Sequence, residues 1–354
     1  MRKIIILGLV IRVGVIFLSL NFTNFDLNSY LKVGQLTLQG MNIYPETARV
    51  HHPYFPFFLY IEAFAIYLKQ LYIHPILFIK TLIIAFDTGI IYLVYLLSNR
   101  NLKSTFAYAI NPIAILICGF HGQFDSIPLF FLLLAIYLAK KQELISILLL
   151  SMAIMFKTWP LFFAISIFRK LKNKLLFILV GIFPFGSILL YSYIFKTKIV
   201  EVVSIIFKHH SLFGIFGAGK IIDLIYRNLN LLPSIFEQRF FFSFFAFTFI
   251  SFSLLTKRSS ILEELLILLL FFYTFTTNFA VQYFLWLTPF LILLKPKRWL
   301  ELNLLIAIYL LTNYASWYLK YTLEFPLTLI GLLIWCLSFK MLCGYRKKNV
   351  DLMR

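Results

Sequence analysis

The stretch PILFIKTLIIAFDTGIIYLVYLL at residues 75–97 decides the fold class of this protein. At about 1.5 Å of rise per residue, a helix of this length matches the roughly 30 Å hydrocarbon core of a bilayer. The basic residues Arg100 and Lys103 follow it closely, as is typical of the cytoplasmic end of a transmembrane helix. The stretch therefore predicts a helix that crosses a membrane and enters the cytoplasm at its carboxyl end.

The composition extends this prediction to the whole chain. Of 354 residues, 61% are hydrophobic and 13% are charged, and 42 are Phe. A water-soluble core of this size cannot bury so many apolar side chains, whereas a bilayer accepts them over the whole protein surface. A soluble enzyme, a fibrous protein and a disordered chain are excluded. The three cysteines lie in or beside apolar stretches, which argues against a disulfide framework or a thiolate metal site.

The distribution of charge predicts the path through the membrane. A net charge of +19 would point to nucleic acid in a soluble chain, but here Lys and Arg form short clusters between apolar runs, which mark cytoplasmic loops. If every cluster lies inside, the runs between clusters must come in pairs. We therefore expect an all-α integral membrane protein, a polytopic bundle of about 12 transmembrane helices with both termini in the cytoplasm. The expected spans are 4–20, 75–97, 105–118, 127–139, 144–156, 159–168, 175–195, 234–255, 261–277, 282–294, 299–317 and 325–343.

Two long external loops follow from this count. The first covers residues 21–74 and contains an apolar run, 54–72, that has no partner span; we expect it to form an interfacial helix outside the membrane. The second external loop covers 196–233. We treat residues 1–354 as one polytopic domain that comprises a catalytic module, 1–168, and a more variable helical module, 169–354.

Asp26 is the candidate catalytic residue, because it lies directly after the first span, at the membrane surface. An ionised carboxylate there would accept a proton from a substrate hydroxyl, as a general base does. The alternative is that Asp26 caps an interfacial helix over residues 27–38.

The second external turn carries His121, Gln123 and Asp125, more polar side chains than a short connection needs. We interpret them as sugar- or acceptor-binding residues, with Asp125 alternatively capping the span that starts near Ile127. Lys157 breaks the positive-inside pattern, because it stands without basic neighbours on the external side. A buried ammonium needs an anion, which a donor phosphate would supply; the alternative is a side chain that reaches the outer headgroups.

Three further groups of polar residues are candidates for binding or structural roles. Lys208, His209 and His210 in the second loop are candidates for phosphate contact, and the His pair alone is weak evidence for a metal. Gln282 and Tyr283 open the tenth span and are candidates for sugar or acceptor binding. Lys80 and Asp87 lie on one face of the second span, about 10.5 Å apart along its axis, and we expect each to pair with another helix in a structural role.

These features, taken in order, resemble the polytopic glycosyltransferases that use lipid-phosphate-linked sugars, the GT-C class. The closest likeness is to the first mannosyltransferase of glycosylphosphatidylinositol assembly and to related prokaryotic mannosyltransferases. The resemblance rests on five short motifs between residues 20 and 290. These are Asp26; Gly40-Met41-Asn42-Ile43-Tyr44 with Tyr54-Phe55-Pro56; Asn111-Pro112 with His121-Gly122-Gln123-Phe124-Asp125-Ser126; Lys157-Thr158-Trp159-Pro160; and Gln282-Tyr283-Phe284-Leu285-Trp286 with Pro289.

The resemblance implies an inverting hexosyltransferase that moves a sugar from a polyprenyl- or dolichyl-phosphate donor to an acceptor hydroxyl. It implies that Asp26 is the catalytic base, that Lys157, His209 and His210 bind the donor phosphate, and that the active site faces away from the cytoplasm. The resemblance implies no required cofactor. The family carries Asp-x-Asp in the first loop, whereas this chain has Asn24 at the first position, which weakens any metal requirement.

Several alternatives stay open at the level of sequence. Mannose is favoured by the resemblance alone, and glucose or arabinose would fit the same reasoning; the acceptor would be a glycolipid, a glycan or a protein. The membrane would be a prokaryotic plasma membrane or the endoplasmic reticulum. The main rival function is a transporter or flippase for lipid-linked sugars, which would place ionisable residues near the bilayer midplane and show repeated halves. A non-catalytic assembly subunit is the third.

Overall fold

The computed structural model describes residues 1–209, 211–321 and 323–350, and almost all of its regular structure is helical. The contacts divide the chain into two compact units, residues 1–209 and 210–354. The module boundary that we expect after residue 168 falls inside the first unit. The division between the units lies within the predicted external loop 196–233, and the assignment of a catalytic and a variable module stays a prediction.

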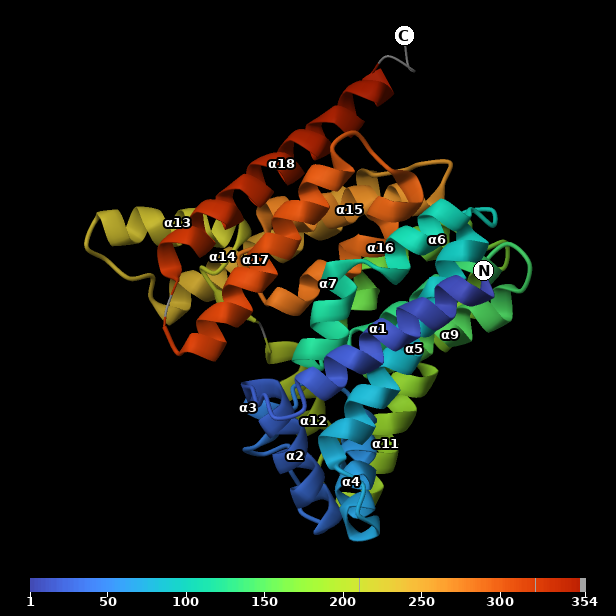
Figure 1. Ribbon diagram of the computed structural model, residues 1–354, viewed down its shortest axis with the longest axis vertical. Coiled ribbons are helices and arrows are strands. Elements are labelled where there is room, and N and C mark those ends of the chain that lie inside the picture. The colour runs from blue at the N-terminus through green and yellow to red at the C-terminus, as the bar shows by residue number, and fades with distance from the viewer. Residues whose placement is uncertain (210, 322, 351–354) are drawn as a thin grey trace. The chain divides into compact units, whose positions relative to one another are not determined.

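The first unit consists of helices only (Figure 1). In chain order they are α1 (Arg2–Leu18), α2 (Phe25–Leu38), α3 (Ala48–His51), α4 (Phe58–Leu68), η1 (Lys69–Leu71), α5 (Pro75–Leu97), α6 (Leu102–Ala109), α7 (Pro112–Ala114), η2 (Ile115–His121), α8 (Ser126–Leu138), α9 (Glu143–Phe156), η3 (Trp159–Phe163), α10 (Ala164–Lys170), η4 (Lys174–Gly181), α11 (Ile182–Phe195) and α12 (Ile199–Lys208).

A buried ion pair fastens three of these helices. α1, α5 and α6 contact one another, and the Arg12 side chain on α1 lies between them with none of its surface exposed. Its Nε donates to Asp87 of α5 at 2.5 Å, its Nη1 donates to the Ala109 carbonyl at the end of α6, and Tyr108 donates to the other Asp87 oxygen at 2.7 Å. The expected structural pairing of Asp87 with another helix is confirmed.

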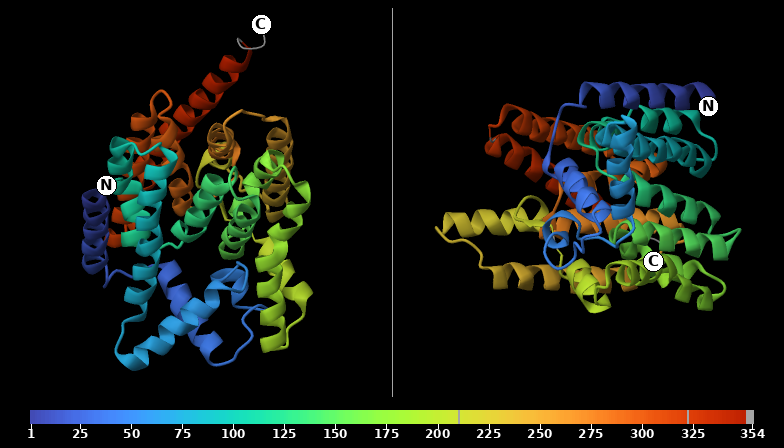
Figure 2. Two further views of the ribbon diagram at one scale, coloured as in Figure 1. Left: turned by 90° about the vertical axis from the view of Figure 1, so that its right-hand side faces the viewer. Right: turned by 90° about the horizontal axis from the view of Figure 1, so that it is seen from below.

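The short helices of the first loop gather at one end of the first unit. Figures 1 and 2 show α2, α3 and α4 near the point where α1 ends and α5 begins. α2 and α4 lie very close together, because Gly34 has no side chain: a Cβ there would lie 2.5 Å from the Glu62 carbonyl oxygen. The helix expected within 54–72 is present as α4 and η1, and its interfacial position stays a prediction.

The second unit contains six further α-helical segments, one 3₁₀ turn and a pair of two-residue strands among its described residues. β1 and β2 pair antiparallel, with Leu212 opposite Phe279 and Phe213 opposite Asn278. The elements are β1 (Leu212–Phe213), α13 (Gly217–Asn228), α14 (Ile235–Leu255), α15 (Ile261–Phe275), β2 (Asn278–Phe279), η5 (Val281–Tyr283), α16 (Phe284–Leu294), α17 (Trp299–Leu319) and α18 (Glu324–Val350).

The helices confirm an all-α, multi-pass membrane protein. A helix occupies each of the twelve expected spans, but among the described residues six helical segments are long and apolar enough to cross a bilayer. They are Pro75–Leu97, Leu102–His121, Lys174–Phe195, Ile235–Leu255, Trp299–Leu319 and Glu324–Tyr345. Shorter apolar helices cover Ser126–Leu138, Glu143–Phe156 and Val281–Leu294. The full count of twelve crossings stays a prediction.

Candidate active site

Asp26 lies in the first turn of α2, and Asn24 holds that turn in place. The Asn24 side-chain oxygen accepts a hydrogen bond from the Leu27 backbone N–H at 2.9 Å, so Asn24, not Asp26, is the N-cap of the helix. The Asn24 amide nitrogen donates to the His121 carbonyl oxygen at 2.9 Å. The cap alternative for Asp26 is therefore wrong, and its carboxylate is available for another role.

His121 meets Asp26 from the opposite side. It ends η2, a π-helix, a form that occurs often at functional sites. The chain turns at Gly122, whose φ of +80° favours glycine and whose missing side chain leaves room for Leu27 and Lys80. His121 Nε2 lies 2.8 Å from Asp26 Oδ2. Because an ionised carboxylate only accepts hydrogen bonds, Nε2 carries the proton that it donates to Asp26.

Lys157 and Asp125 form a buried ion pair beside this dyad. The Lys157 Nζ lies 2.6 Å from Asp125 Oδ2, and their side chains are 5% and 0% exposed. Lys157 follows the last residue of α9, and Asp125 precedes α8, two helices that pack together. The ammonium also lies over the rings of Phe124, at 4.2 Å, and Tyr54, at 5.1 Å. Such placement stabilises a desolvated cation.

Two of the sequence alternatives are overturned by this pair. The Lys157 side chain points into the protein and does not reach toward headgroups. Asp125 stands at the N-cap position of α8, but its side chain makes no cap hydrogen bond and pairs with Lys157 instead. The anion that a buried Lys157 needs is thus supplied by the protein. The expected contact of Lys157 with the donor phosphate stays a prediction. The argument for it assumed an ammonium without a counter-ion, and Asp125 supplies that counter-ion.

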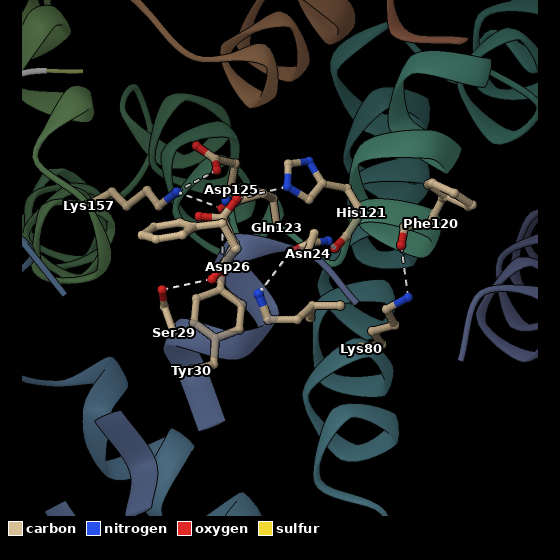
Figure 3. A network of polar contacts seen from close by, with 12 residues as sticks. Asn24, Asp26, Ser29, Tyr30, Lys80, Phe120, His121, Gln123, Asp125 and Lys157 are labelled. Atoms are coloured by element: carbon tan, nitrogen blue, oxygen red, sulfur yellow. Dashed lines mark hydrogen bonds and ion pairs between the residues drawn. The ribbon is translucent and has the colours of Figure 1, made fainter. Parts of the chain in front are cut away.

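Gln123 links the ion pair to Asp26 (Figure 3). Its Oε1 accepts hydrogen bonds from Lys157 Nζ and from the Tyr30 hydroxyl, both at 3.2 Å. These donors fix the orientation of the amide, whose Nε2 lies close enough to Asp26 to lower its pKa but forms no hydrogen bond of ordinary geometry among the described residues. Figure 3 shows Gln123 and Asp26 between Lys157 on one side and His121 on the other. A buried, unpaired N–H donor costs about 1–3 kcal/mol unless a ligand or water accepts from it.

Asp26 is the one accessible acid of the cluster. Its side chain is 29% exposed, whereas His121 and Asp125 are buried. Burial raises the pKa of Asp26, but the hydrogen bond and charge of His121, with contributions from the nearby Gln123 amide and the Lys157 ammonium, outweigh burial and hold the pKa below its ordinary value. Asp26 is therefore ionised at neutral pH and open to a ligand hydroxyl.

The cluster thus unites five of the residues singled out from the sequence, namely Asp26, His121, Gln123, Asp125 and Lys157. Lys80 holds the end of η2, because its ammonium donates to the Phe120 carbonyl at 2.8 Å (Figure 3). The same ammonium also donates to the Ser19 hydroxyl. Lys80 therefore binds carbonyl and hydroxyl oxygens from other segments. Its expected pairing with another helix takes the form of hydrogen bonds.

The other predicted site residues lie elsewhere. His209 is exposed after α12, and His210 lies outside the described residues. Gln282 and Tyr283 belong to η5 of the second unit, where the Tyr283 hydroxyl contacts Ser211 and its ring stacks on Trp286. Their proposed contribution to a recess with Asp26 stays a prediction.

Sequence reasoning missed Tyr30, the contact of the motif residue Tyr54 with Lys157, and the bridging role of Asn24. Tyr30 stands four residues after Asp26, a spacing that places two side chains on one helix face and was a usable signal. Tyr54 reaches Lys157 from a distant part of the chain, so no local pattern announced it.

No protein-family model, curated protein or solved structure matches this chain.

Proposed function

We propose that this protein is an inverting glycosyltransferase of the membrane, which transfers a hexose from a polyprenyl- or dolichyl-phosphate donor to an acceptor hydroxyl. One observation carries the proposal: an ionised, partly exposed Asp26 is held by His121 and lies beside the buried amide nitrogen of Gln123. A base with a neighbouring hydrogen-bond donor is what a single displacement at a sugar requires.

The reaction forms one bond and breaks another. The acceptor oxygen attacks the anomeric carbon while its proton passes to Asp26, and the bond between that carbon and the phosphate oxygen breaks. The lipid leaves as a phosphate monoester with one more negative charge. That growing charge raises the proton affinity of Asp26 during the reaction, so a base that begins with a low pKa becomes stronger as it is needed.

The neighbours of Asp26 have distinct tasks in this proposal. His121 orients the carboxylate through the hydrogen bond to Oδ2 and leaves the other oxygen for the acceptor. Gln123 donates its free N–H groups to a sugar hydroxyl. Lys157 and Asp125 fix Gln123, and their removal would release its orientation.

The resemblance of the motifs favours mannose as the sugar and the extracytoplasmic face as the site of transfer. The donor, with a lipid chain and a phosphate, stands at headgroup level, which fits an acid at the end of the first span. The proposed acceptor is a glycolipid or glycan. Residues Gln282 and Tyr283 are proposed to contact sugar or acceptor, and His209 and His210 the phosphate.

The test separates the enzyme from a transporter for the same lipid. Purified protein in detergent is incubated with radiolabelled polyprenyl-phosphate mannose and a membrane lipid extract as acceptor. Transfer needs no sealed compartment, so we expect the label to move to a new product. If label moves only across sealed vesicles and stays on the donor lipid, the protein is a transporter and the proposal is wrong.

A further inference from the structure

The proposed reaction needs a cation near the leaving phosphate, because that group gains charge as it departs. Lys157 is a poor candidate, since it is 5% exposed and Asp125 already balances its charge. A cation for the donor should be exposed, unbalanced by acid and a few ångströms from Asp26. Lys32 meets the first two conditions among the described residues, because it is exposed and no ion pair joins it to an acid, and it belongs to α2, the helix that carries Asp26.

Lys32 stands on the same helix as Asp26, two steps of three residues further along α2. Six residues advance about 9 Å along the helix axis and turn it by about 240°, so the two side chains leave α2 on different faces. The long Lys32 side chain turns back to His51, the hydrogen-bond partner of Ser29, which stands three residues after Asp26. In a single displacement, Asp26, the acceptor oxygen, the anomeric carbon and the leaving oxygen follow one another at separations of about 3 Å or less. A phosphate roughly 6–9 Å from the Asp26 carboxylate is therefore where this chemistry places it.

A chain of hydrogen bonds fixes the position of the Lys32 ammonium. Lys32 Nζ lies 3.3 Å from His51 Nε2, and since an ammonium only donates, Nε2 is the acceptor. His51 Nδ1 therefore carries the ring proton and donates to Ser29 Oγ at 2.8 Å. Ser29 in turn donates to the Phe25 carbonyl at 2.8 Å. One N–H of the exposed Lys32 is used, and its other two are left for a ligand.

The surroundings of His51 combine positive charge with apolar surface. Arg49, on α3, is also exposed, and among the described residues no ion pair joins Lys32 or Arg49 to an acid. Phe25 stacks on the His51 ring at 5.3 Å and is 58% exposed, and Val50 beside His51 is 57% exposed. Exposed cations beside exposed apolar side chains suit an amphiphile with an anionic head and a hydrocarbon tail.

We infer that Lys32, held in position by His51 and with Arg49 on the neighbouring α3, forms the phosphate subsite for a long-chain lipid phosphate, with Phe25 and Val50 against its tail. The inference rests on the proposed function, because it deepens the same site. It explains why Lys32 and Arg49 stand in a loop that we propose is external. The positive-inside pattern does not favour basic residues there.

The experiment measures binding of polyprenyl monophosphate, the expected product, to full-length protein in detergent by thermophoresis. Lys32→Met keeps the length of the side chain and removes its charge, and Lys32→Arg restores the charge. Lys69→Met removes an exposed cation of the same loop outside the cluster. We expect Lys32→Met to weaken binding about ten-fold and Lys32→Arg to restore it. Lys69→Met should bind like the wild type.

Two comparison ligands identify the source of the phosphate. Inorganic phosphate should bind much more weakly than the lipid, and phosphatidylglycerol should be little affected by Lys32→Met. Equal loss for phosphatidylglycerol would show a general anionic surface and overturn the inference, as would unchanged binding of polyprenyl monophosphate. Tight binding of inorganic phosphate would show that the lipid chain adds little to the affinity, and would overturn the proposed contact of Phe25 and Val50 with the tail. In a transfer assay, Lys32→Met should raise KM for the donor more than it lowers kcat.

The outcomes keep the two proposals apart. If Lys32→Met binds normally while the wild type transfers sugar, the subsite is wrong and the transferase stands. If Lys32→Met loses binding but the wild type transfers no sugar, the subsite stands and the transferase is wrong.

Discussion

Two buried pairs of a cation and a carboxylate in the first unit have the same chemistry and different surroundings. Arg12 and Asp87 lie 2.5 Å apart and Lys157 and Asp125 lie 2.6 Å apart, and all four side chains are at most 5% exposed. The first pair ends in backbone carbonyls and in Tyr108, which is also buried. The second pair leads through Gln123 to the exposed Asp26.

The difference teaches how to distinguish a structural ion pair from a site within a membrane protein. Neither burial nor a short distance is enough, since both pairs have both. Both regions contain a buried nitrogen without a hydrogen-bond partner among the described residues, Gln123 Nε2 in one and Arg12 Nη2 in the other. The Lys157 pair lies beside the accessible, ionised Asp26, whereas the Arg12 pair joins three helices and contacts only buried groups. Matched substitutions in the two regions test this distinction.

The largest effect is expected at Asp26. Asp26→Asn preserves shape but removes the base, so the rate of sugar transfer should fall about a hundred- to ten-thousand-fold. The side chain is partly exposed and Asn still accepts from His121, so thermal unfolding in detergent should be nearly unchanged. A folded Asp26→Asn protein with undiminished turnover would remove Asp26 from the base role.

The same substitution in the other region should have the opposite signature. Asp87→Asn leaves the buried Arg12 charge without its counter-ion, and we expect a loss of about 3–5 kcal/mol in the free energy of unfolding. Denaturant unfolding measures this loss, and turnover per folded molecule should stay close to the wild type. Lost turnover with unchanged stability would show that Asp87 takes part in the reaction.

A smaller effect is expected at His121. The His121→Asn substitution removes a bond and a charge that lower the Asp26 pKa, while burial, which raises it, stays. The base must be ionised, so kcat/KM should begin to fall at a higher pH as the solution is acidified, and turnover at pH 7 should drop on the order of ten-fold. The exposed His74 is a control, and His74→Asn should leave the profile unmoved. If the acidic side of the kcat/KM profile does not shift for His121→Asn, His121 does not lower the pKa of Asp26.

The sequence was sufficient for the coarse fold, because apolar runs and basic clusters record how a chain inserts into a membrane. It also indicated Asp26, His121, Gln123, Asp125 and Lys157, since polar residues at span ends are costly and few. The sequence did not indicate which residues pair with one another. Arg12 interrupts the apolar run of the expected span 4–20, but nothing near it in the sequence indicates its partner. Asp87 lies 75 residues further on, and only the packing of α1 against α5 brings the two together.

Asn24 shows the same limit more sharply. Its identity alone indicated a missing carboxylate, whereas its position shows an amide that caps α2 and donates to His121. An aspartate could accept the first hydrogen bond but would have no donor for the second. What the residue does depends on the approach of η2 to α2, which packing sets and local sequence does not.

The anomeric configuration of the transferred sugar tests the central claim most directly. A base that activates the acceptor in one displacement predicts inversion, whereas a carboxylate that attacks the sugar itself gives a covalent intermediate and retention. The anomeric configuration of the glycoside that the purified protein forms from polyprenyl-phosphate mannose is determined by NMR and compared with that of the donor. Inversion is the predicted result, and retention would contradict the role assigned to Asp26.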